Sequence, residues 1–410
     1  MGYLIQVSKG TLVAHFISAL TPFIIASFFD PEEIGVLALY TSIVSFIASF
    51  AGLDFFSAIN VSKSEEDVPS LFTLSCIISI FSTTILLVVY GLSFLFQEIV
   101  PYDIYSSSVL FLYPWAIFFS LHFALIESFA RLKMFNFLGR NQILRAGISS
   151  SLQITSGLLG FGVVALLASR VIGEVVSFLY SYKKLKFPLK KEMDINKLKR
   201  TFKKFKSYSF HITPTRIMLT LGKNGPIFII TGFYSLKEVG WFTLASKAVS
   251  LSSSIIAENI QKVFESRSTS YKEEDLQGFY QKTLILSLCF AIAMSIPLYL
   301  ISLYSDSLPI SSKWIKAFSF IPPLLPIVFG NFINALNYST LKRLESLKAL
   351  RNFTIVENIL IFGAMLAFAS KKTDVLILTL IYSASTLSLA LLKASYTFRE
   401  LKKSKDLAKR

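Results

Sequence analysis

The chain has 410 residues, of which 53% are hydrophobic and 16% are charged, and its formal net charge is +16. A soluble protein carries charges on about a quarter of its residues, so this composition excludes an ordinary soluble domain. Lysine and arginine gather in short breaks between apolar runs, which indicates the loops of a membrane protein and argues against nucleic acid as a partner.

A helix that crosses a bilayer needs about 20 mostly apolar residues. Scanning the chain for such runs predicts twelve spans, six on each side of a strongly basic segment at 183–206. The first run is taken as a membrane helix because no small-residue cleavage site of a signal peptide follows it. The sequence thus predicts an all-α integral membrane protein with two six-helix lobes. The predicted spans are 11–29, 35–59, 70–96, 107–130, 143–161, 163–181, 208–232, 240–263, 279–304, 315–337, 352–370 and 374–398.

These spans define an N-terminal lobe at 1–182, a basic linker at 183–206, a C-terminal lobe at 207–398 and a basic tail at 399–410. Alternate loops differ sharply in charge. One set contains Lys63, the loops at 131–140, 267–272 and 342–351, the linker and the tail. It is far richer in lysine and arginine than the alternate set, which contains 30–33, 97–105, 233–239, 305–313 and 371–372. By the positive-inside rule the basic set is cytoplasmic, which places both termini inside. The linker and tail are expected to contact anionic lipid headgroups.

An internal echo relates the two lobes. Residues 33–39 read EIGVLAL and residues 238–244 read EVGWFTL, each at the start of the second span of its lobe. The shared position indicates a duplication. Because each lobe has an even number of spans, the two repeats are expected to be parallel, related by an axis along the membrane normal.

Ionisable residues within a span are costly and usually face a bundle interior or a watery cavity. Arg216 and Lys223 lie two turns apart in the seventh span, and Lys247 and Glu258 lie three turns apart in the eighth, so each pair shares a helix face. We expect Lys223, Lys247 and Arg216 to form a cationic lumen that binds substrate. The alternative is snorkelling to the interface or a structural ion pair.

Two further pairs have the spacing i,i+4, which favours structural ion pairs: Glu127 with Arg131 in the fourth span, and Arg170 with Glu174 in the sixth. If its pair opens, Glu127 becomes a candidate proton carrier, because burial raises the proton affinity of a carboxylate. Asp54 and Glu258 are the other ion-coupling candidates. Asn331, Asn334, Asn337 and Glu357 are interpreted as interhelical hydrogen-bonding groups.

The sequence suggests neither cofactor nor catalytic chemistry. The three histidines are scattered, and Cys76 and Cys289 lie inside apolar runs, so no metal spacing is present. There is no P-loop pattern, and no nucleophile–base set is suggested by position. A membrane glycan polymerase or ligase would be expected to carry a large outside loop, which this chain lacks. The sequence therefore predicts a protein that is not an enzyme and binds no metal.

Three regions resemble the polysaccharide-transporter, or O-antigen flippase, family of the multidrug/oligosaccharidyl-lipid/polysaccharide (MOP) superfamily. The first hairpin, 22–35, ends in DPEEIG, and the loop at 127–135 reads ESFARLKMF and is followed by Arg145 and Gln153. The third region runs from FKSYS at 205–209 through GWF at 240–242 to AENIQKVF at 257–264. The likeness extends over nearly the whole chain.

This resemblance implies a flippase that moves an undecaprenyl-pyrophosphate-linked oligosaccharide, of O-antigen or similar surface polysaccharide, to the periplasmic leaflet of the bacterial inner membrane. It implies two lobes around a cationic cavity, alternating access, and coupling to H⁺ or Na⁺. A glycan polymerase is a possible partner. The alternative within the same superfamily is a multidrug or small-solute antiporter.

Overall fold

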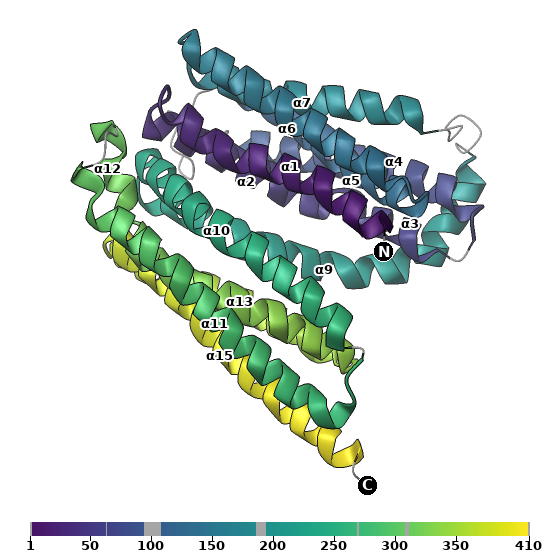
Figure 1. The fold of residues 1–410 in the computed structure, drawn as a ribbon. Helices are drawn as coiled ribbons and strands as arrows, with labels where there is room; N and C mark the ends of the chain where they lie inside the picture. Colours follow the sequence, from purple (N-terminus) through teal and green to yellow (C-terminus); the bar gives the residue numbers. More distant parts are fainter. Residues whose placement is uncertain are drawn as a thin grey trace. The chain divides into compact units, whose positions relative to one another are not determined.

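The structure is a computed structural model that describes residues 2–62, 64–93, 108–185, 194–268, 270–307 and 311–408. These residues form helices and turns and contain no strand (Figure 1). Each of the twelve predicted spans overlaps a helix. Among the described residues, seven helices are long and apolar enough to cross a membrane, and the bent pair α12 (Ser312–Phe318) and α13 (Ile321–Arg343), which meet at 46°, makes up to eight. The predicted all-α membrane class is confirmed.

The chain forms two compact units. Unit 1 contains residues 1–29 and 36–220, and unit 2 contains residues 30–35 and 221–410. In unit 1, α1 (Gly2–Ile25) runs along α6 (Phe135–Leu158), which also packs on α7 (Gly162–Lys184) (Figure 1). Helix α5 (Leu112–Arg131) contacts both α7 and α4 (Asp67–Ser93). Unit 1 also includes α2 (Pro31–Phe50) from Val36 onward, α3 (Ala58–Val61) and the start of α9 (Ile195–Phe233).

The core of unit 1 is aromatic where α3, α4 and α5 meet. Phe55, Phe56, Phe72 and Phe129 are fully buried there. Phe55 stacks on Phe202 of α9, with ring centroids 5.2 Å apart. Large rings fill this space and have few rotatable bonds to order, so they form a well-defined core beside Asp54.

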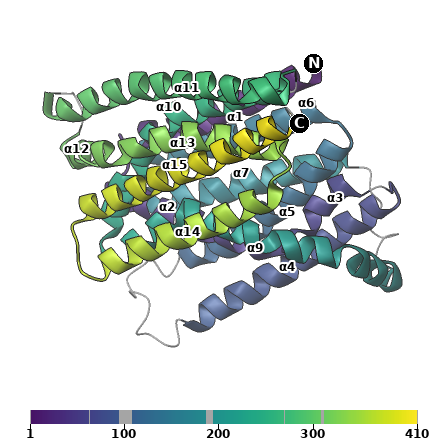
Figure 2. The same ribbon diagram turned by 90° about the horizontal axis from the view of Figure 1, so that it is seen from below.

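Unit 2 is organised around α13, which packs against α10 (Leu236–Ser268), α11 (Glu273–Leu303) and α15 (Val375–Ala408). Figure 2 shows α11, α13 and α15 running alongside one another, and α14 (Leu347–Ala369) packs on α15. Leu336 of α13, Tyr280 of α11 and Leu401 of α15 are completely buried in the core of this unit.

The two repeated segments begin their helices in the same way. The amide of Asp30 donates to Glu33 Oε2 at 2.9 Å, and the amide of Ser235 donates to Glu238 Oε2 at 3.0 Å, which is the capping-box arrangement. The glycine of each segment then lies against the other segment. A Cβ on Gly35 would stand 1.9 Å from the carbonyl oxygen of Leu236, and one on Gly240 would stand 1.8 Å from that of Pro31. No larger residue fits either position without a backbone shift.

Turns at equivalent places in the two halves also have the same hydrogen-bond pattern. The turn from α5 to α6 places Lys133 at a φ of 56° and has Met134 N donating to Phe129 O. The turn from α13 to α14 places Glu345 at 55° and has Ser346 N donating to Leu341 O. A residue with a positive φ, followed by an amide that donates to the carbonyl five residues earlier, is a common way to end a helix. These shared turns support the predicted duplication.

The structure differs from the expected elements in two places. Helix α9 begins at Ile195, where Asp194 Oδ1 accepts from the amide of Asn196 at 2.9 Å, so the second half of the predicted linker is helical. The division between the units falls between Thr220 and Leu221, inside this helix. The predicted span 35–59 is broken at 51–57. Residues 186–193 of the linker, the predicted outer loop at 97–105 and tail residues 409 and 410 lie outside the described residues.

Candidate functional site

The candidate site in unit 1 begins at a break in the second span. After α2 ends at Phe50, a kinked segment, Ala51–Ser57, leads into α3, and Gly52, Leu53 and Asp54 within it have φ angles of 71°, 43° and 55°. The left-handed region is disfavoured for residues with a Cβ, so two consecutive non-glycine residues there are held by their surroundings. Backbone strain of this kind is concentrated at functional sites, so the break is a candidate functional site.

This break places a carboxyl–guanidinium pair in the interior of unit 1. Arg216 Nη2 of α9 lies 3.0 Å from Asp54 Oδ1, and the Asp54 side chain is 0% exposed. Ser57 Oγ donates to the same oxygen at 2.5 Å, and Arg216 Nη2 donates to Ser57 Oγ at 3.1 Å. Asp54 Oδ2 has no hydrogen-bond partner among the described residues. One oxygen of this buried carboxyl group therefore has no hydrogen-bond donor among the described residues.

Aromatic rings flank the guanidinium of this pair. Arg216 Cζ lies 4.8 Å from the ring centre of Phe56 and 5.7 Å from that of Phe123. The two rings stack on each other at 5.4 Å. A guanidinium is weakly hydrated and binds aromatic faces well, so the rings stabilise a cation that has lost most of its water. We call Asp54, Ser57, Arg216, Phe56 and Phe123 the Asp54 cluster.

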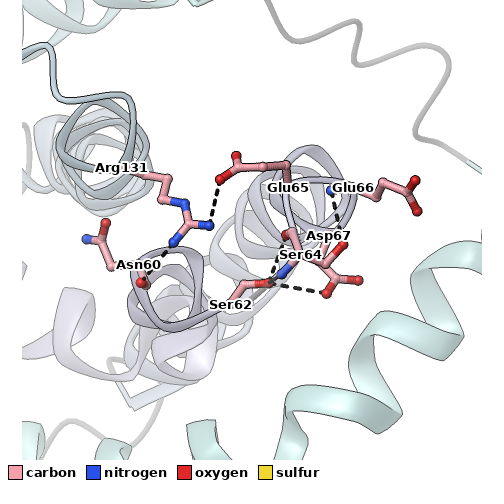
Figure 3. Close-up of polar contacts among 7 residues, drawn as sticks. All are labelled: Asn60, Ser62, Ser64, Glu65, Glu66, Asp67 and Arg131. Carbon is pink, nitrogen blue, oxygen red and sulfur yellow. Dashed lines mark hydrogen bonds and ion pairs between the residues drawn. The ribbon is translucent and has the colours of Figure 1, made fainter.

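Glu127 and Arg131 lie on α5 but have different partners from the one that their spacing predicted. Asn60 Nδ2 of α3 donates to Glu127 Oε2. Arg131 Nη2 binds Glu65 Oε1 at 2.7 Å, and its Nη1 donates to the Asn60 carbonyl at 3.3 Å (Figure 3). Among the described residues Glu127 and Arg131 do not pair with each other, because Asn60 of α3 and Glu65 in the turn after it offer them other partners. Arg131 instead fastens that turn to the end of α5.

The other predicted pair also differs. Glu174 is buried, and its Oε1 lies 3.4 Å from Arg145 Nη1 of α6. Arg170 has no ion pair within 4.0 Å of its charged atoms in the part of the chain that the structure describes. The partner comes from the neighbouring helix because α6 and α7 pack closely here: a Cβ on Gly173 would stand 2.0 Å from Ser149 Oγ.

The predicted cationic residues are divided between the units. Arg216 belongs to unit 1 and joins the Asp54 cluster, while Lys223 belongs to unit 2. Lys223, Lys247 and Glu258 have exposed side chains on α9 and α10. Beside Lys223, Gly222 lets α14 approach so closely that a Cβ would stand 1.6 Å from Asn358 Oδ1. The lysine is thus carried on a tightly packed, glycine-containing part of α9.

Sequence reasoning missed one buried charge in unit 2. Lys393 Nζ of α15 lies 2.7 Å from Glu357 Oε2 of α14 and 3.0 Å from Asn334 Oδ1 of α13, and its side chain is 8% exposed. The available signal was a lone lysine within the apolar run 374–398. The interpretation of the asparagines is confirmed: Asn331 bonds Ser253, Asn334 bonds Lys393 and Asn337 bonds Tyr280, each between two helices.

Known structures share this fold over almost the entire chain. An inward-facing multidrug resistance MATE family transporter of the MOP superfamily aligns over 98% of this chain and 99% of its own, with 14% identity and a TM-score of 0.71. The lipid II flippase MurJ in an inward closed conformation aligns over 98% and 90%, with 13% identity and a TM-score of 0.69. The chain is therefore a multi-pass membrane protein with the MOP transporter fold.

The family follows from the sequence itself. The model of the family described as "Polysaccharide biosynthesis protein" matches residues 24–319. The chain belongs to this family, and the predicted membership among the polysaccharide transporters of the MOP superfamily is confirmed. No curated protein matches this sequence significantly.

Proposed function

We propose that this protein is a flippase that moves an undecaprenyl-pyrophosphate-linked oligosaccharide from the cytoplasmic to the periplasmic leaflet of a bacterial inner membrane by alternating access. The observation that carries the proposal is the match of residues 24–319 to a polysaccharide biosynthesis family, combined with the fold of MOP transporters. A member of a polysaccharide biosynthesis family that has a transporter fold is well suited to carry the glycan across the membrane. O-antigen or a similar surface repeat unit is the proposed cargo.

The proposed contacts to the anionic part of this cargo are Lys223, Lys247 and Arg216. An ammonium or guanidinium makes strong, charge-assisted hydrogen bonds to a pyrophosphate or an acidic sugar. Lys223 and Lys247 both have exposed side chains, and we take Lys223 as the first residue to test because it lies near the middle of its predicted span. The Lys223→Ala variant should lose most glycan export at an unchanged protein level. Lys206→Ala, which removes an exposed lysine from the same helix, should leave export intact.

We assign ion coupling to the Asp54 cluster, with Glu127 and Glu258 as further candidates. The supporting observation is the buried Asp54 carboxylate, which has one oxygen paired to Arg216 and the other without a partner among the described residues. A buried carboxylate that exchanges a proton or Na⁺ changes the charge balance of its site, which biases a two-state transporter. The coupling ion is H⁺ or Na⁺.

Reconstituted protein tests the coupling. Transfer of lipid-linked oligosaccharide between the leaflets of proteoliposomes should speed up under a pH or Na⁺ gradient. Asp54→Asn should remove this acceleration, while Glu65→Gln, which alters an exposed carboxylate, should retain it. Thermal unfolding of both variants separates loss of coupling from loss of fold. A normal gradient response in folded Asp54→Asn protein would reject the assignment.

The proposed orientation has both termini in the cytoplasm. It follows from the concentration of lysine and arginine in alternate loops. In this orientation the basic segment and tail contact anionic lipids, and a glycan polymerase on the opposite side would receive the product. Two repeated lobes, divided near the basic segment, would supply the alternating movement.

The experiment that tests the function follows lipid-linked oligosaccharide in cells that lack this gene. We expect the intermediate to accumulate in the cytoplasmic leaflet, surface polysaccharide to be lost, and both to be restored by the intact gene. Normal surface glycan in a strain without a second flippase would remove the function and leave the fold.

The second candidate is a multidrug or small-solute antiporter. It is favoured by the aligned MATE family transporter, with its TM-score of 0.71. The cationic residues argue against cationic drugs as cargo. Altered drug sensitivity in cells that lack the gene, together with normal surface glycan, would favour this candidate.

A further inference from the structure

A pocket with both polar and apolar lining residues lies in unit 2, and none of the residues assigned to transport lines it. It has a volume of about 750 Å³ and is formed by the end of α11, the turn after it, α12 and the start of α13. That volume is within the roughly 300–1,000 Å³ of typical small-molecule sites. Three apolar side chains line the pocket, from Leu303, Ile315 and Pro322. Its polar and aromatic lining residues are Tyr299, Ser302, Ser305, Asp306, Ser312, Lys316 and Ser319.

The two charged groups of this pocket are open to a ligand. Asp306 and Lys316 both have exposed side chains, and neither forms an ion pair within 4.0 Å in the part of the chain that the structure describes. The neighbouring Lys313, by contrast, binds Asp30 at 3.2 Å and does not line the pocket. The pocket therefore offers one carboxylate acceptor and one ammonium donor that protein groups do not neutralise.

The walls of the pocket are already ordered. Ser302 Oγ of α11 donates to the carbonyl of Phe318 at 2.7 Å, which ties α11 to the end of α12. Ser319 Oγ donates to the carbonyl of Lys316 at 2.7 Å. Both hydroxyl oxygens keep lone pairs to accept from a ligand. A preformed site loses less entropy on binding than one that must be ordered.

Lys316 makes a cation–π contact with Trp241. Its Nζ lies 4.7 Å from the ring centre of Trp241, and the Trp241 indole N–H donates to the carbonyl of Lys313 at 2.9 Å. A cation over an indole face is attracted to it, so the lysine is oriented without losing its charge. The ammonium of Lys316 thus belongs to a pocket that also has serine hydroxyl groups and the exposed Tyr299 ring in its lining.

We propose that this pocket binds carbohydrate, as an accessory site for the glycan part of the transported molecule. Sugar hydroxyls both donate and accept, which suits a lining of serine hydroxyls, one carboxylate and one ammonium, and the apolar face of a sugar ring suits Tyr299. An acidic substituent would pair with Lys316. The inference rests on the proposed function for the identity of the glycan. The predicted orientation places the pocket on the periplasmic side, where it would hold the glycan after transfer.

Binding to the full chain in lipid nanodiscs tests the proposal. The probe is the repeat-unit oligosaccharide released from the cells' lipid carrier by mild acid, observed by saturation-transfer difference NMR. Asp306→Asn and Lys316→Met should each weaken binding about tenfold or more, as expected when a charge-assisted hydrogen bond is lost. The matched control Lys313→Met should bind as the unaltered protein does, because Lys313 lies outside the pocket.

Two results would overturn the proposal. Equal binding by all the variants would show that the oligosaccharide binds elsewhere. Displacement of the oligosaccharide by glycerophosphoethanolamine at equal concentration would show that the pocket is a lipid headgroup site. Glycan export in cells lacking the gene reports separately on the proposed function. If cells lacking the gene lose export but all the variants bind the oligosaccharide equally, only the pocket proposal is rejected. If those cells export glycan normally but the variants lose binding as expected, only the flippase proposal is rejected.

Discussion

At the scale of single residues, unit 2 contains a buried lysine, Lys393, whose charge is costly in a membrane unless it is paired. Lys393 is held by Glu357 and Asn334 from two other helices. A buried pair of this kind adds little net stability compared with apolar residues, but removing one partner leaves a buried charge without compensation. The three side chains therefore act as one group, and its members should be changed together.

Lys393→Met should destabilise the protein by about 3–5 kcal/mol, because Glu357 keeps its buried charge or must take up a proton. The double variant Lys393→Met, Glu357→Leu should recover most of that loss. Thermal unfolding in detergent measures both. Lys403→Met, which breaks the exposed pair with Glu400 at 2.7 Å, is the control and should leave the midpoint unchanged. Equal midpoints for the single and double variants would contradict the coupling.

Single residues also show where the sequence ceases to be informative. Asp54 and Arg216 were both recognised as unusual, but their pairing joins residues 162 positions apart and depends on how α9 packs against the break after α2. The spacing i,i+4 predicted partners for Arg131 and Glu174, and cross-helix partners replaced both. Local spacing gives only a weak preference, of about 0.2–0.5 kcal/mol, which a neighbouring helix easily outweighs.

At the scale of helices, two glycines of the repeated segments make a close contact with backbone in unit 2. An added methyl group at Gly35 or at Gly240 would overlap a backbone carbonyl of the opposite segment. Backbone cannot move aside as a flexible side chain can. The starts of α2 and α10 are thus fixed against each other by a contact that the duplication supplies twice.

Gly35→Ala and Gly240→Ala should each destabilise the protein by about 1–3 kcal/mol and lower the yield of folded protein. Gly147→Ala is the matched control, because Gly147 also lies in a helix and an added Cβ meets nothing within 4 Å. This control should be neutral or stabilising by about 0.5–1 kcal/mol, the usual gain of alanine over glycine in a helix. A drop in melting temperature for the control similar to that of the test variants would show that the close contact is not the cause.

Helices were predictable from the sequence where apolar length decides them. Each of the twelve predicted spans overlaps a helix, and seven or eight of the described helices are long and apolar enough to cross a membrane, where only a helix satisfies the backbone of a single segment. The break at 51–57 was not predictable, since Leu53 and Asp54 adopt left-handed conformations that their residue types disfavour and only tertiary packing can impose. The early start of α9 was missed because a lysine-rich segment resembles a loop in hydropathy, although lysine is a good helix former.

At the scale of the whole molecule, the remaining question is which ends of the helices face the cytoplasm. The two native cysteines, Cys76 and Cys289, are free, and Cys289 lies on an apolar, exposed face of α11 that suits lipid. A chain from which both have been removed accepts single reporter cysteines at defined turns. This gives the orientation without changing any charged residue on which it depends.

Ser346→Cys, in the turn between α13 and α14, and Ser370→Cys, in the turn between α14 and α15, form the decisive pair. The positive-inside rule places the first turn in the cytoplasm, because Lys342, Arg343, Lys348 and Arg351 surround it. A membrane-impermeant maleimide should therefore label Ser370→Cys in spheroplasts and label Ser346→Cys only after the membrane is opened. The reverse pattern would place the termini outside and would move the carbohydrate pocket to the cytoplasmic side, where it would meet the glycan before transfer.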